Sequence, residues 1–348
     1  MDFTLSEEQA LLARSVDQFA GRALARPGPG VWQALAEMGW LAIGLPEEVD
    51  GIGGAVETML VCAGLGRALV TEAFLPTVVL GAGLLARLGR MELLPQVVTG
   101  GLKLAVALSE PPDGFDPLRP ATTAGRRGSG YALHGRKSTV LAAPEADLLL
   151  APALLDGAVA VFLLRPATAG LTMRPGRLAD GRGAADLILD GAEAELLGTD
   201  AATALGQVAD LAVAATCADA VGAMREAVRI TINHLKTRRQ FGAPLASLQV
   251  LQHRVVDMCM ELEHATSLTE VAAMACDGDD PAQRTRFVSA AKARVAKAAR
   301  FIGEQAIQLH GGIGMTAEHV IGRYYKRLLA DEMLFGDRMF HLDRLVAA

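Results

Sequence analysis

Apolar residues are spaced for helices at both ends of the chain and for strands in the middle. In residues 1–102 and 200–348 they recur every three or four positions, whereas residues 103–199 alternate short apolar runs with turn residues. The first spacing lines one face of a helix, and the second is typical of short strands. The pattern therefore predicts a mainly α protein with a central β-domain between an N-terminal helical segment and a C-terminal helical bundle.

The N-terminal segment is predicted to hold several short helices. Ser6 followed by Gln9 is typical of a capping box, in which each side chain bonds the other residue's backbone N–H. Apolar positions continue this helix through Phe19 and Ala20. Further helices are expected near residue 31, over residues 57–69, and near residues 75–88 and 91–98.

Short apolar runs in the middle segment are candidate strands. They occupy residues 104–108, 130–133, 138–141, 147–151, 158–164, 171–173 and 185–189. Regular short strands separated by turns favour a small antiparallel β-domain.

Long amphipathic stretches follow, and we expect them to form a four-helix bundle. They cover residues 201–238, 247–277, 282–309 and 316–334. In such a bundle apolar stripes face inward and charged residues face solvent. Among the charges expected on the outer surface are Lys292, Arg294, Lys297 and Arg300.

The composition excludes several classes of protein. The 348 residues carry a formal net charge of −6, so the basic footprint of a nucleic-acid-binding protein is absent. The four cysteines lie far apart, and the seven histidines have no ligand spacing, so we expect no metal site. The cysteines are instead expected to be small core residues.

Targeting segments are also not evident in the sequence. The N-terminus is polar and acidic, unlike a secretory signal. The longest uncharged run, residues 73–86, is too short to span a bilayer. We therefore expect a cytoplasmic protein without membrane insertion.

Two turns could hold a phosphate-bearing ligand, although each also has a purely structural interpretation. The sequence QLHGGIG at 308–314 follows a long helix, and its glycines either end that helix or let a cofactor approach the backbone. The sequence KTRRQFG at 236–242 ends another helix, where an arginine either complements the helix dipole or binds a diphosphate. The usual dinucleotide and phosphate-loop motifs are absent.

Together these segments resemble the acyl-CoA dehydrogenase family over nearly the whole chain. WQALAEMGW at 32–40 and LPEE at 45–48 are similar to its first-domain signature. SEP at 109–111 resembles its Thr-Glu-Pro turn, and the two turns above resemble its Arg-x-x-Phe-Gly and Gln-x-x-Gly-Gly-x-Gly turns. The resemblance implies an N-terminal α-helical domain at 1–102, a small antiparallel β-barrel at 103–199 and a C-terminal four-helix bundle at 200–348.

The resemblance also implies a bound FAD. Ser109 and Thr139 would lie against the flavin ring. The diphosphate and adenosine, in part those of an FAD in a neighbouring subunit, would contact Arg238, Phe241, Gln249, Gln308, Gly311 and Gly312. The chain would therefore form a homo- or hetero-oligomer, either a dimer or a tetramer.

The family reaction converts an acyl-CoA to the trans-2-enoyl-CoA. A carboxylate base takes the α-proton, the flavin takes the β-hydride, and the electrons then pass to an electron-transfer flavoprotein. The family's Tyr-Glu-Gly-Thr base motif is altered in this chain. Counting back from Arg344 puts Asp337 at the base position, whereas alignment on Gly336 puts Phe335 there and leaves no base.

This sequence also departs from the family pattern at other positions that take part in the family's reaction or contact its flavin. Ala212 stands at the family's second base position, and the nearby Asp210 is expected to be a solvated charge. Thr139-Val140-Leu141 replaces a Trp-Ile-Thr segment, and Phe115 replaces a Ser. These changes resemble the short bacterial subunits of heteromeric acyl-CoA dehydrogenases, which act in fatty acid or steroid side-chain degradation.

Two functions therefore stay open. The chain is either a dehydrogenase with Asp337 as its base or a non-catalytic partner subunit that shares FAD. A helical scaffold without FAD and an oxidase that uses oxygen are further alternatives.

Overall fold

The computed structural model describes residues 3–25, 30–111 and 115–347, which form two compact units. One comprises Met1–Pro27, Met59–Val70 and Val213–Ala348, and the other comprises Gly28–Thr58 and Thr71–Ala212. Each unit joins segments that are far apart in sequence. Because this grouping reflects packing alone, the three domain boundaries stay a prediction.

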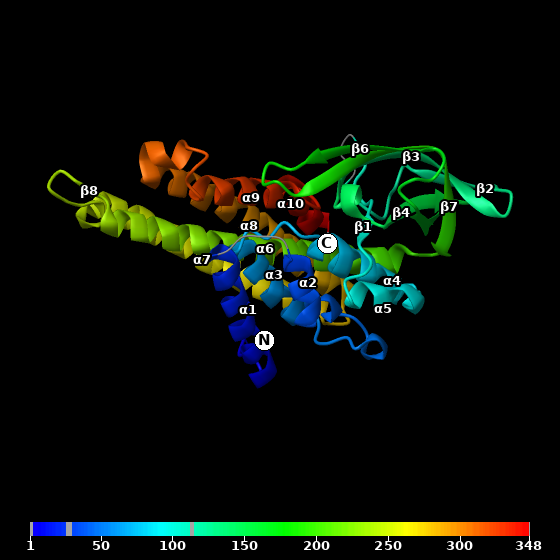
Figure 1. Cartoon of the computed structure of the whole chain (residues 1–348), viewed down its shortest axis with the longest axis horizontal. Coiled ribbons are helices and arrows are strands. Elements are labelled where there is room, and N and C mark those ends of the chain that lie inside the picture. Colours follow the sequence, from blue (N-terminus) through cyan, green and yellow to red (C-terminus); the bar gives the residue numbers. More distant parts are fainter. Residues whose placement is uncertain (1–2, 26–29, 112–114, 348) are drawn as a thin grey trace. The chain divides into compact units, whose positions relative to one another are not determined.

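Long helices make up most of the first unit, and Figure 1 labels them. They are α6 (Ala202–Thr237), α7 (Gln249–Cys276), α8 (Pro281–His310), α9 (Ile321–Met333) and α10 (Arg338–Ala347), with α1 (Glu7–Ala25) and most of α3 (Ala55–Arg67) from the N-terminal segment. Their core is aliphatic and includes Met224, Met258, Val288 and Ile302, all fully buried. The predicted bundle is confirmed, and α10 follows it as a shorter helix.

The start of α1 matches the sequence prediction in detail. The Ser6 N–H donates to Gln9 Oε1 at 3.0 Å, and the Gln9 N–H donates to Ser6 Oγ at 3.1 Å. The capping box is therefore confirmed.

Two glycines let α3 and α6 cross in backbone contact. A Cβ added to Gly222 would lie 1.8 Å from the Ala63 carbonyl oxygen, and one added to Gly66 would lie 2.0 Å from the Asp219 carbonyl oxygen. Any side chain at either position would push the two helices apart, because backbone atoms cannot move aside.

Two charges predicted to face solvent are buried instead. Lys292 and Asp210 are each 1% exposed. The Lys292 ammonium on α8 donates to the Asp331 carbonyl oxygen on α9. Asp210 lies on α6, where every residue from 210 to 224 is buried. The prediction for Asp210 was wrong because this stretch of α6 is buried all round and has no outer face for a charge. The prediction for Lys292 was wrong because Lys292 lies on the face of α8 that packs against α9, whereas Lys297 and Arg300 of the same helix are exposed.

The middle segment forms a small barrel in the second unit. Its strands are β1 (Leu104–Val106), β2 (Thr123–Arg127), β3 (Gly130–Leu141), β4 (Leu148–Leu155), β5 (Ala158–Leu164), β6 (Leu171–Arg177) and β7 (Gly183–Gly198). Along the order β4-β2-β3-β7-β5 each strand pairs with the next, and β5 pairs back with β4 to close the ring. The predicted barrel is confirmed; most pairs are antiparallel, but β1 and β2 both pair with β4 in parallel.

The strand predictions differ from the structure in two places. β2 was not predicted, because four of its five side chains are exposed and it has no apolar run. The runs predicted at 130–133 and 138–141 are the two ends of one strand, β3, which carries a bulge between Lys137 and Val140. A bulge inserts an unpaired residue and re-aims its neighbours.

Short helices complete the second unit. They are α2 (Val31–Glu37), the π-helix η3 (Leu75–Ala82), α4 (Gly83–Arg87) and α5 (Leu94–Val98). η3 is fixed to β1 by Thr77, whose hydroxyl accepts from the Leu104 N–H at 3.1 Å and donates to the Leu104 carbonyl oxygen at 3.0 Å.

Within residues 3–25, 30–111 and 115–347, one helix is long and apolar enough to cross a membrane. This is α6, whose most apolar 18-residue window has a mean hydropathy of 1.3. However, 83% of that window is buried within the protein, and a core helix passes the same test, so the evidence for a span is weak.

Candidate functional site

Ser109 and Thr139, the two predicted flavin-ring contacts, lie together in the β-domain. The Ser138 N–H donates to the Ser109 carbonyl oxygen at 2.9 Å and joins the two segments. Thr139 occupies the bulge of β3 with a φ of 51°, and its N–H donates to Asp186 Oδ1 at 2.9 Å. Asp186 thus supports a backbone conformation that is unusual for a β-branched residue, and the sequence pattern did not point to it.

A buried ion pair lies directly behind these two residues. The Lys137 ammonium donates to Glu110 Oε1 at 2.5 Å and to the Pro152 carbonyl oxygen at 2.7 Å, and the Thr122 hydroxyl donates to Glu110 at 2.6 Å. Burial would raise the pKa of Glu110, but the Lys137 charge and these hydrogen bonds outweigh it and lower the pKa. The charged pair fixes residues 109–110 against β3.

Arg238 and Arg239 follow α6 but have different surroundings. Arg239 Nη2 donates to the Gly242 carbonyl oxygen at 3.1 Å and closes the hairpin of β8 (Arg239–Gln240) and β9 (Ala243–Pro244). The Arg238 guanidinium is exposed and has no hydrogen-bond or ion-pair partner among the described residues. Phe241, at the tip, is 90% exposed with a φ of 53°. Arg238 is therefore the arginine available to an anion.

Gln249 is the first residue of α7, at the other side of the same hairpin. The preceding Leu248 provides no side-chain cap, so N–H groups of the first turn stay available. Such a helix end favours an anion through its dipole. The Leu245 N–H donates to the Arg238 carbonyl oxygen at 2.9 Å and links the segment before α7 to the end of α6.

The glycine turn after α8 has an open backbone. Gly311 has a φ of 65°, and a Cβ added to Gly311 or to Gly312 would meet no atom within 4 Å. Gln308 lies in the last turn of α8, and its side chain is exposed. A ligand can therefore approach the main chain here as closely as the glycines permit.

Three stacked histidines bring the arginine turn and the glycine turn together. The ring centroid of His234, one turn before Arg238 on α6, lies 4.4 Å from that of His310, which directly precedes Gly311. His319 lies 4.6 Å from His310. Burial lowers the pKa of His310 to about 4, and burial with the charges of His319 and Arg238 lowers the pKa of His234. We refer to these three residues as the histidine stack.

The histidine stack borders a pocket of about 520 Å³. His319 lines it together with Gln308, Gly314, Thr316 and residues of α9, including Arg323 and Lys326. No group of three or more His, Cys, Asp or Glu side chains within the described part of the chain could hold a metal ion. The pocket is therefore suited to an organic ligand that carries an anionic group.

Asp337, the candidate base, begins α10. Its Oδ1 accepts a hydrogen bond from the Phe340 N–H at 2.8 Å, which is the arrangement of a helix N-cap. The two residues before it form a tight turn, with φ values of 57° at Phe335 and 103° at Gly336. Figure 1 shows α10 far along the bundle from β8, so the start of α10 and the β8–β9 hairpin are separate places in this unit.

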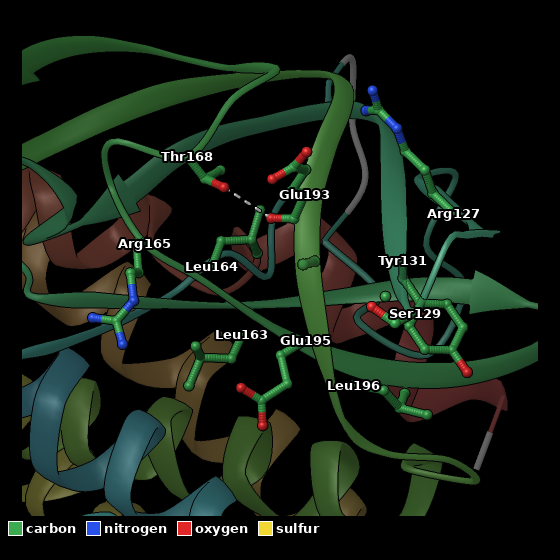
Figure 2. A pocket seen from close by; sticks show the side chains of 12 residues that line it. Arg127, Ser129, Tyr131, Leu163, Leu164, Arg165, Thr168, Glu193, Glu195 and Leu196 are labelled. Carbon is green, nitrogen blue, oxygen red and sulfur yellow. Dashed lines mark hydrogen bonds between the residues drawn. The ribbon is translucent and has the colours of Figure 1, made fainter.

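A second pocket, of about 640 Å³, lies on the β-domain and contains none of the predicted site residues (Figure 2). Its lining mixes Tyr131 and leucines with Arg127, Arg165, Glu193 and Glu195. Some of these polar groups already have partners: Glu195 pairs with Arg90 at 3.3 Å, and the Thr168 hydroxyl donates to the Glu193 carbonyl oxygen at 3.2 Å.

Comparisons with known proteins agree with this fold. Residues 6–100 match the N-terminal domain of acyl-CoA dehydrogenases, and residues 204–348 match their C-terminal domain. Acyl-CoA dehydrogenase FadE27 of Mycobacterium tuberculosis is 30% identical over 330 residues, which cover 90% of this chain and 86% of that protein.

Two solved structures are similar over nearly their whole length. The ChsE4–ChsE5 complex from Mycobacterium tuberculosis has a TM-score of 0.89 at 27% identity and covers 100% of this chain and 98% of its own. A variant of the Tcur3481–Tcur3483 steroid ACAD has a TM-score of 0.86 at 28% identity, and the match covers 98% of this chain and 96% of that chain. With 30% identity to a named dehydrogenase across nine-tenths of its length, this chain belongs to the acyl-CoA dehydrogenase family, whose members are oxidoreductases acting on CH–CH bonds.

Proposed function

We propose that this chain is the partner subunit of a two-component, FAD-dependent acyl-CoA dehydrogenase and that it does not supply the base. The observation that carries the proposal is the hydrogen bond from the Phe340 N–H to Asp337, which commits that carboxylate to the start of α10. If Asp337 acts as a helix cap, the alignment on Gly336 applies, and it leaves Phe335 at the family's C-terminal base position. At the family's second base position, on α6, the residue is Ala212. Neither residue can take a proton.

The complex would convert an acyl-CoA to its trans-2-enoyl-CoA. The α-proton goes to a carboxylate on the homologous partner, and the two electrons of the β-hydride leave through an electron-transfer flavoprotein. FAD, when bound, supplies the hydride acceptor. Solved relatives at 27% and 28% identity are described as two-component assemblies, which supports a heteromer.

The residues at the hairpin end of the bundle fit FAD. Its diphosphate is a dianion, and Arg238 offers a guanidinium that has no partner among the described residues, beside the uncapped N-terminus of α7. Gly311 and Gly312 leave the backbone of this turn open to a ligand, because no atom lies within 4 Å of where a Cβ would stand at either position. The pocket beside Gln308, at about 520 Å³, is large enough for a nucleoside.

The residues expected beside the flavin ring fit FAD less well, and this also favours the role of a non-catalytic partner subunit. Thr139 stands where the family has a tryptophan, so the aromatic wall is missing, although Ser109 and the bulge are in place. The chain therefore has residues suited to the FAD diphosphate, such as Arg238, but lacks the aromatic residue that would lie against the flavin ring. Its own residues would bind and orient a cofactor that is reduced in the partner's active site.

We infer a bulky acyl chain as the substrate class. The support is the relative described as a steroid ACAD, which covers 98% of this chain. An oligomer with shared cofactor sites follows from the same proposal.

A second candidate is a self-sufficient dehydrogenase in which Asp337 is the base and Ser109 and Thr139 contact the ring. It is favoured by the half-buried state of Asp337, since only Oδ1 is used by the cap. An aspartate is one methylene shorter than the family's glutamate, a displacement of about 1 Å that can cost about a hundredfold in rate.

Asp337→Asn separates the two candidates, because asparagine keeps the cap but cannot take a proton. The full chain, alone and co-purified with a base-bearing homologue, would be mixed anaerobically with acyl-CoA thioesters while flavin absorption is recorded. We expect bleaching only in the complex, and equally with Asp337→Asn. Bleaching by the chain alone that Asp337→Asn abolishes would overturn the proposal in favour of the second candidate.

A further inference from the structure

The histidine stack lies between the two features that would hold the FAD diphosphate, so this inference rests on the proposed function. The His234 carbonyl oxygen accepts the Arg238 N–H at 2.8 Å, and His310 is covalently joined to Gly311. The 4.4 Å contact between the two rings therefore sets the distance between the arginine turn and the glycine turn. His319 extends the stack to the pocket beside Gln308.

His310 has a buried nitrogen with no partner. Its Nδ1 lies 2.8 Å from the Ala306 carbonyl oxygen, and since a carbonyl can only accept, Nδ1 carries the proton. Nε2 is then left as an acceptor. His310 is 5% exposed, and its Nε2 has no hydrogen-bond partner in the part of the chain that the structure describes. A buried polar atom without a partner is uncommon in folded proteins, so this nitrogen is the one on the ring that can take a proton.

The charges around the stack oppose a proton in the absence of a ligand. Arg238 follows α6 one turn after His234, and Arg323 and Lys326 of α9 line the adjoining pocket. The nearby carboxylates are Glu304 of α8, which lines the same pocket, and Glu318, which directly precedes His319. The three rings also repel one another when charged, because each neighbour lies within 5 Å. Burial and these charges together therefore disfavour a proton on His310 and His234 until negative charge arrives.

We propose that the histidine stack positions Arg238 and the Gly311 turn for the FAD diphosphate and takes up a proton from solvent when that dianion binds. The anion offsets the charges of Arg238 and its cationic neighbours, which lowers the electrostatic cost of a proton on an imidazole that burial disfavours. One imidazole nitrogen gains a proton, and no other bond changes. The stack acts through Arg238 and the backbone, so its members are positioning residues.

Proton uptake on binding predicts a definite dependence of affinity on pH. Because the bound state holds the extra proton, FAD binds more tightly as the pH falls towards the range in which the free stack itself becomes protonated. In this pH range, each unit by which the pH is lowered should reduce the dissociation constant for FAD by up to about tenfold. Calorimetry at about pH 6 in two buffers of different ionisation enthalpy counts the protons directly.

The test uses the co-purified complex, stripped of flavin and titrated with FAD while flavin fluorescence and heat are recorded. The test variants are His319→Gln, at a partly buried position, and the double variant His234→Gln/His319→Gln, in which glutamine is a good helix former at position 234. The matched control is His264→Gln, since His264 on α7 also contacts an arginine, Arg294, at 2.7 Å but has no stacked ring. Thermal unfolding verifies that each variant is folded.

We expect proton uptake in the wild type and in His264→Gln, and a reduced or absent uptake with a flatter pH profile in the stack variants. If uptake is absent from the wild type, or if the stack variants weaken FAD equally at every pH, the inference is overturned while the proposed function stands. A complex that binds no FAD at any pH would overturn the proposed function and this inference with it.

Discussion

Arg327 on α9 donates two hydrogen bonds to the Asp219 carboxylate on α6, at 2.7 and 2.9 Å, and a third to the Val70 carbonyl oxygen at 2.7 Å. Arg327 is 3% exposed, so these buried hydrogen bonds connect α9 to α6 and to the residues that follow α3. Cys62 lies in the same region, where burial and the charge of Asp219 raise the pKa of its thiol.

Replacing Arg327 with methionine should strongly destabilise the chain. The Asp219 carboxylate would stay buried without its partner, which costs about 3–5 kcal/mol of unfolding free energy. Urea unfolding monitored by circular dichroism measures the loss. The control is Arg300→Met, because Arg300 pairs with Glu332 at 2.9 Å but is half exposed, and such pairs contribute about 0–1 kcal/mol. Equal losses in both variants would contradict the role given to the buried pair.

Asp337→Ala should lower the free energy of unfolding by about 1 kcal/mol through loss of the α10 cap, whereas Asp337→Asn should leave it nearly unchanged. The comparison needs no cofactor, since it tests the hydrogen bond to the Phe340 N–H alone. If the asparagine variant lost as much stability as the alanine variant, the carboxylate charge and not the cap would be what matters at this position.

Lys137→Met should destabilise the β-domain more than Lys103→Met. The first leaves Glu110 buried and unpaired, at a cost of about 3–5 kcal/mol. The second removes a partly exposed lysine that pairs with Glu145 at 3.3 Å. The double variant Glu110→Gln/Lys137→Met should recover part of the loss, because it removes both charges. No recovery in the double variant would mean that packing of the Lys137 stem, and not its charge, is what stabilises β3.

His341 predicts a loss of stability in mild acid. Burial, together with the Lys292 charge, lowers the pKa of His341 to about 3 from 6.5, so the folded chain keeps this ring neutral. Between pH 6.5 and about 3 the unfolded chain binds a proton that the folded chain does not, and stability therefore falls as the pH falls. The slope from one such group is at most about 1.4 kcal/mol per pH unit.

Unfolding of His341→Gln at several pH values tests this dependence. The variant loses contacts to Ser289 and to the Phe335 carbonyl oxygen, so it should be less stable near neutral pH, but its stability should fall less steeply in acid. His264→Gln, at an exposed position, serves as the control. Parallel slopes for the wild type and His341→Gln would exclude His341 as the source.

Arg238→Gln should weaken FAD binding by the complex about tenfold or more, because a charge-assisted hydrogen bond contributes about 1.5–3 kcal/mol. Arg239→Gln should have a smaller effect, since Arg239 bonds only the Gly242 carbonyl oxygen of its own hairpin. Fluorescence titration of FAD into the stripped complex distinguishes them. A larger loss with Arg239→Gln would reverse the assignment of the two arginines.

The periodicity of apolar residues was sufficient to predict the long helices, because a period of 3.6 fixes which face is buried over many turns, whereas the short α10 was not predicted. The capping box of Ser6 and Gln9 was equally readable, since both partners lie within one turn. β2 was missed because its strand character comes from pairing with β3 and not from its own exposed side chains. Lys292 and Asp210 were misplaced because their burial depends on neighbours that a single helix pattern does not contain.

The candidate site was readable only in part, for a similar reason. The motifs identified the arginine and glycine turns, but the choice of Arg238 over Arg239 depends on a hydrogen bond across the hairpin. The histidine stack joins residues 234, 310 and 319, whose contact is a product of the bundle and not of local sequence. Asp186 likewise bonds a residue 47 positions away.

The crossing of α3 and α6 has a consequence for the order in which the chain can fold. During synthesis Gly66 and Ala63 emerge about 150 residues before Asp219 and Gly222, the positions against which they pack. Val16 of α1 packs at Gly64 from the start, but until then the positions of α3 that meet α6, Ala63 and Gly66, lack their native contacts. The N-terminal part therefore cannot finish folding as it leaves the ribosome, and its exposed face is where a chaperone would be needed longest.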